Sequence, residues 1–308
     1  MPPDPFHRGE HAAQARAGVQ LQGAPIRDSM PDQHRQFFAQ LPILFAAVAD
    51  ETGWPVATAL AGPPGFVSSP DPHTLHVATL PGQDDPAAPA LRAGAPIGLL
   101  GIDLATRRRN RANGTVVATN AQGFMVRVQQ SFGNCPQYIQ ARDIEAEATS
   151  PGAEQAERLD GLDQRARALI AGADTFFVAS SIGAEGGDAG GLDMSHRGGR
   201  PGFVRIDGDV LTIPDFRGNR YFNTLGNLML EPRAGLLFVD FATGDLLHLQ
   251  GRAELDWDGG PASHFAGAER LWRMQVTAGW RRPGALASRW SFRGFAPTTE
   301  RTGRWDAD

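Results

Sequence analysis

The chain has 308 residues, of which 41% are hydrophobic, with one cysteine and a formal net charge of −5. All 29 basic residues are arginine, which excludes lysine Schiff-base chemistry and a P-loop, and the negative net charge argues against a nucleic-acid partner. The single cysteine, Cys135, excludes an intrachain disulfide and any multi-cysteine metal site within one chain.

Apolar runs are all shorter than the roughly 18 residues that a membrane-spanning helix needs. The opening stretch "MPPDPFHRGEHAAQARAG" carries charges where a secretory signal has an apolar core. We therefore expect a soluble, cytoplasmic protein with no membrane partner.

The first half of the chain predicts one helix followed by short strands. Ser29 and Pro31 supply start signals for a helix over residues 31–40. The elements expected next are strands at 43–49, 64–67 and 74–80, a short helix at 85–94, a strand at 98–106 and a strand ending near Gly114.

The second half predicts the same order of elements. The leucines of "RLDGLDQRARALI" recur at helical spacing and predict a helix over 157–171. The elements expected after it are strands at 175–181, 201–204 and 210–216, a short helix at 219–230, a strand at 235–243 and a strand ending near Gly251.

An internal repeat explains this parallel. "GLLGIDLAT" (98–106) and "GLLFVDFAT" (235–243) are identical at six of nine positions, and their residue numbers differ by 235 − 98 = 137. "GPPGFV" (62–67) and "GRPGFV" (199–204) share this repeat offset, as do Gly114 and Gly251. The sequence predicts a mainly β (α+β) fold of two tandem antiparallel barrels, residues 1–150 and 151–308, with the boundary in the polar stretch 145–157.

Polar residues that occur in only one copy are candidates for a site, because residues needed for the common fold should persist in both. Ser195, His196 and Arg197 align with Thr58, Ala59 and Leu60. The stretch "RGNR" (217–220) aligns with "LPGQ" (80–83). The second copy therefore carries polar groups that the first copy lacks.

These groups suit a phosphate. Gly218 would allow close backbone approach, and Asn219 would cap the following helix, whose N-terminus favours an anion. Arg217, Arg220, Arg197, Ser195 and Thr224 would add charge-assisted and hydroxyl hydrogen bonds. The alternative is that these arginines are solvated loop charges and that His196 is structural. The sequence shows no Ser-His-acid order, paired carboxylates or HExxH motif.

Residues 195–255 resemble the pyridoxamine 5'-phosphate oxidase-like flavoproteins, whose fold is the FMN-binding split barrel, and are most similar to the two-barrel branch. The resemblance includes residues 30–38, 62–67, 134–140 and 290–305. It implies that FMN is bound, with its phosphate held by Ser195, His196, Arg197, Asn219 and Arg220, and that the backbone of Ile213, Pro214 and Asp215 runs along the flavin ring.

The resemblance also implies that FMN lies between two barrels. Family members place it at a homodimer interface, so the two barrels of this chain would form a pseudo-dimer, with a degenerate cofactor site in the first barrel. A homodimer of the whole chain stays open. Family oxidases of pyridoxamine phosphate use a lysine at the phosphate and a C-terminal Arg/His pair, both missing here, so oxidation of vitamin B6 is not expected.

The leading hypothesis is an FMN-dependent oxidoreductase that takes hydride from a reduced nicotinamide, NAD(P)H, or a similar donor and passes it to a small organic acceptor or oxygen. The alternatives are a flavin- or tetrapyrrole-binding carrier or sensor without turnover, and a protein whose cleft binds nothing.

Other residues allow two interpretations. Cys135 is either a structural thiol or a reactive thiol facing the flavin. Trp272, Trp280 and Trp290 pack in the core or against a planar ligand. Arg107, Arg109 and Arg111 share one face of a strand, either as a solvated edge or reaching the cleft from the first barrel.

Overall fold

The computed structural model describes residues 4–21, 23–133, 135–145, 155–183, 191–257 and 264–305. Strands dominate this part of the chain, and every strand pair in it is antiparallel. The predicted mainly β, antiparallel fold is thereby confirmed. None of the described helices is long and apolar enough to cross a membrane.

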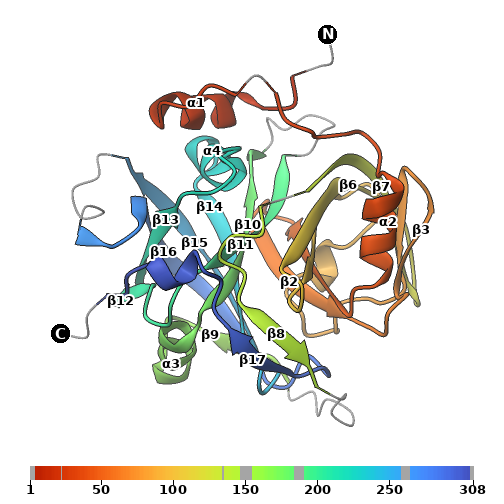
Figure 1. Ribbon diagram of the computed structural model, residues 1–308. Coiled ribbons are helices and arrows are strands. Elements are labelled where there is room, and N and C mark those ends of the chain that lie inside the picture. Colours follow the sequence, from red (N-terminus) through yellow and green to blue (C-terminus); the bar gives the residue numbers. More distant parts are fainter. Residues whose placement is uncertain are drawn as a thin grey trace.

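The first sheet has seven strands in the order β2-β1-β5-β6-β7-β4-β3. They are β1 (Ile43–Ala49), β2 (Pro55–Ala61), β3 (Val67–Asp71), β4 (Thr74–Val77), β5 (Pro96–Asp103), β6 (Arg108–Asn120) and β7 (Gly123–Gly133). Helix α2 (Asp32–Ala39) lies beside this sheet, and a single 3-10 turn, η1 (Ala88–Ala90), precedes β5 (Figure 1).

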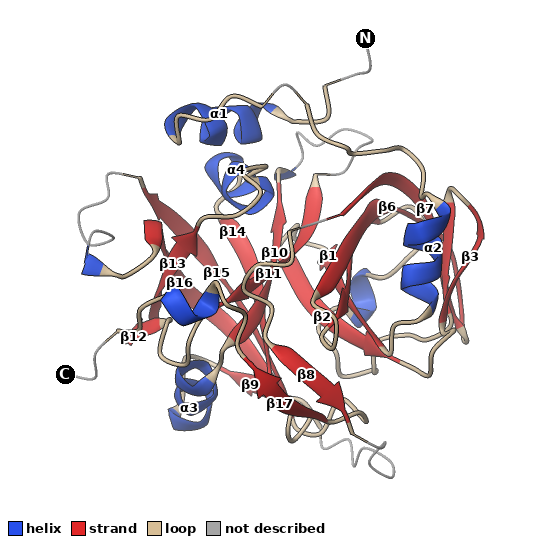
Figure 2. Ribbon diagram, in the orientation of Figure 1, coloured by secondary structure: helices blue, strands red, loops and turns tan. Residues whose placement is uncertain are grey.

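The second sheet follows the same plan in the order β11-β10-β14-β15-β16-β13-β12, with β9 added on β16. Its strands are β9 (Glu157–Leu159), β10 (Thr175–Ser181), β11 (Leu192–Gly198), β12 (Arg205–Asp207), β13 (Val210–Phe216), β14 (Arg233–Val239), β15 (Leu246–Asp256) and β16 (Ala268–Arg282). Helices α3 (Gln164–Gly172) and α4 (Asn223–Leu230) accompany it (Figure 2).

The repeat offset reappears as strand equivalence. Strand β11 begins at Leu192 and β2 at Pro55, which are separated by the repeat offset, and the two strands have the same length. Strand β14 begins at Arg233 and β5 at Pro96, which are separated by the same offset. Strands matched in this way occupy the same place in the two sheet orders.

Several expected elements differ from the structure. The "PGFV" segments are turns, because Gly65 and Gly202 take positive φ angles of 98° and 87°, and Phe66 and Phe203 are buried beneath them. The adjoining strands begin only at Val67 and at Arg205. Burial of the two phenylalanines explains why these apolar segments were wrongly predicted to be strands.

Three of the predicted helices were wrong at their starts. Residues 157–159 form β9, and α3 begins at Gln164 because the side chain of Asp163 caps the N–H of Ala166. The helix expected over 85–94 is only the turn η1, and the helix expected over 219–230 begins at Asn223. Helix α1 (Arg8–Arg16) and strands β7 and β16 were not predicted.

An apolar seam joins the two sheets. Its residues come from both halves of the chain, and at its centre the rings of Phe45 and Phe177 stack with centroids 3.6 Å apart. Beside this stack, two glycines meet the opposing backbone. A Cβ on Gly98 would lie 2.5 Å from the carbonyl oxygen of Leu192, and one on Gly235 would lie 2.4 Å from that of Pro55. The repeated glycine of the "GLL" segments therefore sets how closely the sheets approach.

Two further contacts connect the halves of the chain. Strand β8 (Ala141–Ile144) pairs with β17 (Trp290–Gly294). The 3-10 turn η4 (Thr299–Arg301) follows β17. Helix α1 packs on α4. The boundary expected at residue 150 lies outside the described residues, so the division into residues 1–150 and 151–308 stays a prediction.

The three tryptophans singled out in the sequence lie in different surroundings. Trp272 is fully buried in the core of the second sheet, and Trp290 belongs to the seam. Trp280 is partly buried, and the guanidinium carbon of Arg158 lies 5.9 Å from its ring centroid. None of the three lines the pocket described below.

Helix α1 is held against α4 by buried polar bonds. Gly9 and Gly226 let the two helices touch, since a Cβ on Gly9 would lie 2.2 Å from the carbonyl oxygen of Gly226. Glu10 is 3% exposed and accepts from the backbone N–H of His7 at 2.9 Å and from the side-chain amide of Asn223 at 2.5 Å. Burial, reinforced by the charge of Asp193, raises the pKa of Glu10 to about 8.

We expect a methyl group at the seam to destabilise the fold. Gly98→Ala or Gly235→Ala places a Cβ against backbone that cannot give way locally, at a cost of about 1–3 kcal/mol in the free energy of unfolding. Gly172→Ala is the control, because no atom lies within 4 Å of its Cβ position. Urea unfolding should rank both seam variants below Gly172→Ala, and equal stability of the three would contradict the role of the seam.

Glu10 predicts a pH-dependent stability. Its folded-state pKa of about 8 lies above the ordinary value of 4.5, so the folded state holds a proton that the unfolded state releases. Stability from this group is complete below pH 4.5 and is lost as the pH rises to about 8, with a slope of about 1.4 kcal/mol per pH unit. Unfolding measured across this window should show a shallower decline for Glu10→Gln than for the wild type, with Glu51→Gln, at an exposed turn, as control. Identical slopes in the wild type and Glu10→Gln would contradict the prediction.

Candidate functional site

A polar pocket lies where the two sheets meet. Its walls come from β11, β13, β16 and the loop leading into α4 on one side, and from β6 of the first sheet on the other. The lining residues are Arg109, Arg111, Gln137, Tyr138, Ser195, His196, Arg197, Gly198, Phe203, Pro214, Asp215, Phe216, Gly218, Asn219, Arg220, Phe222, Asn223, Thr224, Leu225, Glu269 and Arg270.

Most of the predicted site residues meet in this pocket. The lining set includes Ser195, His196, Arg197, Pro214, Asp215, Asn219, Arg220 and Thr224. Two predicted residues lie outside it. The side chain of Ile213 is fully buried in the core, and the side chain of Arg217 is exposed while its carbonyl accepts from the Tyr138 hydroxyl at 3.1 Å.

Ser195 is the junction of the two walls. Its Oγ accepts from Arg111 Nη2 at 2.6 Å and from Thr224 Oγ1 at 2.8 Å. One of these partners lies on β6 of the first sheet and the other in the first turn of α4. The hydroxyl of Ser195 lines the pocket and can rotate to donate its proton to a ligand oxygen there.

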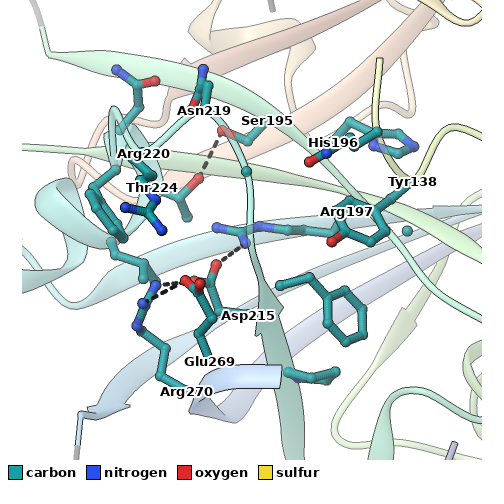
Figure 3. A pocket seen from close by; sticks show the side chains of 18 of the residues that line it. Tyr138, Ser195, His196, Arg197, Asp215, Asn219, Arg220, Thr224, Glu269 and Arg270 are labelled. Atoms are coloured by element: carbon teal, nitrogen blue, oxygen red, sulfur yellow. Dashed lines mark hydrogen bonds and ion pairs between the residues drawn. The ribbon is translucent and has the colours of Figure 1, made fainter. Parts of the chain in front are cut away.

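Arg197 reaches across the pocket to Asp215, with which it forms an ion pair (Figure 3). Asp215 is 5% exposed and also binds Arg270 Nη1 at 2.5 Å, and Arg270 in turn contacts Glu269 at 3.0 Å. A carboxylate from the strand β13 therefore already satisfies part of the Arg197 guanidinium, and the binding of a phosphate by Arg197 stays a prediction.

The loop before α4 has an unusual backbone. Arg220 and Phe222 have positive φ angles of 63° and 62°, and Phe222 occupies the N-cap position without a side-chain cap. Asn219 was predicted to cap the helix and does not, because its Oδ1 accepts from the N–H of Tyr221 at 3.2 Å, ahead of the helix. Strained backbone of this kind is concentrated at functional sites. No described residue forms an ion pair with Arg220.

Two arginines enter from the first sheet. Arg111 is 7% exposed and is paired with Asp193 at 3.1 Å, whereas Arg109 donates from Nη1 to Nδ1 of His196 at 3.1 Å and has no carboxylate partner among the described residues. Nε of each guanidinium is buried without a hydrogen-bond partner. Burial and the neighbouring Arg111 lower the pKa of Arg109 to about 9, so Arg109 is still charged at neutral pH.

The interpretation in which these arginines reach the cleft thus describes Arg109 and Arg111. Arg107 does not share their position. It precedes β6, has a φ of 59° and donates from Nε to the carbonyl oxygen of Ile139 at 3.0 Å.

His196 is a neutral imidazole. Burial and the surrounding arginines hold its pKa well below 6.5. Because an arginine only donates hydrogen bonds, Nδ1 of His196 is the acceptor and the proton resides on Nε2, which is buried without a partner.

The charges of the pocket do not balance. Five arginines line it, against the carboxylates of Asp215 and Glu269, with Asp193 behind Arg111. Two positive charges remain uncompensated, and Glu10, which approaches Arg111, is protonated at neutral pH. A pocket of this charge, with unpaired N–H groups and the first turn of the helix α4 on its wall, matches a dianionic phosphate.

Tyr138 and Phe216 give the pocket an aromatic wall that the residue-by-residue reasoning missed. Their rings stack with centroids 5.2 Å apart and an interplanar angle of 28°. The segment "NCPQYIQ" was the only sequence signal for Tyr138, through the family resemblance. Cys135 is partly exposed and does not line the pocket. Within the described ranges no group of His, Cys, Asp and Glu residues is arranged to hold a metal ion.

No family model and no curated protein matches this chain. Solved structures similar to part of it include an FAD-binding protein from Mesorhizobium loti, with 12% identity, 42% of this chain and 97% of the other covered and a TM-score of 0.30. A putative pyridoxamine 5'-phosphate oxidase from Lactobacillus delbrueckii has 16% identity, coverage of 34% and 95% and a TM-score of 0.26. HutZ, the heme storage protein from Vibrio cholerae, has 14% identity, coverage of 40% and 96% and a TM-score of 0.27. TM-scores this low decide neither the family nor the function.

Proposed function

We propose that this protein is an FMN-dependent oxidoreductase that holds the FMN phosphate in the pocket between the two sheets. The observation that supports the proposal is the pair of uncompensated positive charges on a wall with unpaired buried donors. Arg109, Arg220 and the hydroxyl of Ser195 would bind the phosphate, with Arg111 positioning Ser195 from the opposite wall.

The ring of FMN would lie along β13. Strand β12 pairs only with residues 210–212 of β13, so beyond that point this edge has no strand partner among the described residues. The backbone at Ile213, Pro214 and Asp215 and the rings of Tyr138 and Phe216 border that edge. These groups would orient the ring and keep water from one side of it.

FMN supplies the hydride and electron transfer, here between a reduced nicotinamide or similar donor and a small organic acceptor or oxygen. The residues of this chain bind and orient it. His196 stays neutral at neutral pH, because burial and the surrounding arginines lower its pKa. A chain without lysine offers no flexible ammonium at the phosphate, and oxidation of vitamin B6 is not part of the proposal.

A tetrapyrrole carrier is less well supported by the pocket. His196 is the histidine among the lining residues, and its Nδ1 lone pair already accepts from Arg109 while Nε2 carries the proton. An imidazole in this state has no lone pair for iron. A flavin carrier without turnover uses the same contacts as the oxidoreductase, and only turnover separates the two.

Removal of Arg109 should weaken FMN binding. Arg109→Leu deletes one charge-assisted contact to the phosphate, worth about 1.5–3 kcal/mol, or a rise in Kd of about 10- to 100-fold. Arg108→Leu is the matched control, since Arg108 is exposed on the same strand and outside the pocket. Quenching of flavin fluorescence during titration measures both, and equal affinities of the two variants would refute the phosphate assignment.

Turnover is tested with the loaded protein. NADH or NADPH added without oxygen should bleach the visible flavin absorbance, and admission of oxygen or a small acceptor should restore it. Stable colour with every donor, together with tight FMN binding, would favour the carrier. Failure to take up FMN at all would refute both.

A further inference from the structure

A buried polar cluster is related to the pocket by the repeat. Its residues are Thr58, Asp85, His248 and Arg282, and we call it the Thr58 cluster. Strand β2 lies against β15 as β11 lies against β6. At the repeat offset, Thr58 corresponds to Ser195 and His248 to Arg111. The Thr58 cluster therefore has a hydroxyl and a nitrogen-bearing side chain at the positions that form the junction of the pocket.

A carboxylate of the chain itself lies at the centre of the Thr58 cluster. Asp85 is 2% exposed, and its Oδ2 accepts from Thr58 Oγ1 at 2.6 Å and from Arg282 Nη1 at 2.6 Å. Its Oδ1 accepts from the backbone N–H of Ala87 at 2.8 Å. His248 is buried nearby, with Nδ1 bonded to the carbonyl oxygen of Ala57 at 2.9 Å and Nε2 unpaired. A hydroxyl, a guanidinium and a backbone N–H thus surround one bound anion.

In the pocket, by contrast, no described carboxylate bonds to the hydroxyl at the corresponding position. The residue that corresponds to Asp85 is Phe222, which lines the pocket. Thr58 Oγ1 bonds to Asp85, whereas Ser195 Oγ bonds to Arg111 and Thr224. The carboxylates of the pocket lining, Asp215 and Glu269, bond instead to arginines. The two sites therefore differ in whether the chain places a carboxylate on this hydroxyl.

We propose that the carboxylate of Asp85 occupies the position that a ligand phosphate would otherwise take. The pocket and the Thr58 cluster are then two anion sites built on the same plan, and Asp85 occupies the one at Thr58. One chain accordingly binds one phosphate-bearing ligand. The anionic group of that ligand bonds to the hydroxyl of Ser195, just as the carboxylate of Asp85 bonds to the hydroxyl of Thr58. This inference rests on the proposed function for the identity of the ligand, and on the comparison of the pocket with the Thr58 cluster for its position.

The first test installs the carboxylate in the pocket. Phe222 has a left-handed backbone that Asp and Asn adopt more readily than Phe, so Phe222→Asp and Phe222→Asn should both fold. Calorimetric titration with inorganic phosphate should show at least tenfold weaker binding by Phe222→Asp than by Phe222→Asn. Both variants lose the ring of Phe222, and only Phe222→Asp gains a negative charge. Equal phosphate affinities of the two variants would therefore overturn the proposal.

The second test removes the carboxylate from the Thr58 cluster. Asp85→Ala should bind one more inorganic phosphate per chain than the wild type. Asp85→Asn should not, because the amide still occupies the space of the carboxylate. Circular dichroism confirms folding, and Arg282→Ala added to Asp85→Ala should abolish the extra phosphate. A folded Asp85→Ala that binds no more phosphate than the wild type would overturn the proposal. If the wild type takes up no FMN while Asp85→Ala gains a phosphate, the proposed function fails and the anion site at Thr58 stands.

Discussion

The backbone contact at Gly98 and Gly235 determines where the rest of the site can lie. Without a Cβ at these positions, β5 approaches β11 and β14 approaches β2 closely enough for the rings of Phe45 and Phe177 to stack at 3.6 Å. The same approach brings the guanidinium of Arg111, on β6, within 2.6 Å of Ser195 on β11. A wider seam would break this bond, and the pocket would lose one wall.

The pocket and the Thr58 cluster differ in how the cost of burying charge is met. Burial of an ion without a partner is expensive, and a paired ion recovers part of that cost. The Thr58 cluster pairs Arg282 with Asp85 inside the chain. The pocket at Ser195 leaves Arg109 without a carboxylate partner in the described part of the chain, so stability is given up where a ligand is expected to restore it.

How much the sequence predicts depends on the range of each interaction. Strands β1, β10 and β13 have the bounds expected from their apolar runs and turn signals, because these signals are local. Comparison of the two copies at the repeat offset selected Ser195, and the phosphate interpretation added Thr224; the two hydroxyls do meet in the pocket. The turns at Gly65 and Gly202 were mistaken for strands, since an apolar run does not reveal which side chain fills a core.

The sequence-based prediction of the site is limited for the same reason, because the site depends on contacts that are not local. The ion pair of Arg197 with Asp215 and the entry of Arg109 from the first sheet depend on contacts between distant strands. Periodicity and spacing do not encode which strands become neighbours. Comparison of the copies identified which residues differ in chemistry, and only the fold showed which of them share a pocket.

Helix α1 has a consequence for the order of assembly. It is made before either sheet, yet its binding partner α4 ends at Leu230, in the second half of the chain. During synthesis α1 has no packing partner until α4 has been made and has folded. Glu10 and Gly9 become buried only at that stage. The loop at Arg220, which α1 contacts through the bond from Gln14 to the carbonyl oxygen of Tyr221, is therefore completed late. A nascent chain can therefore form its first sheet before the pocket is complete.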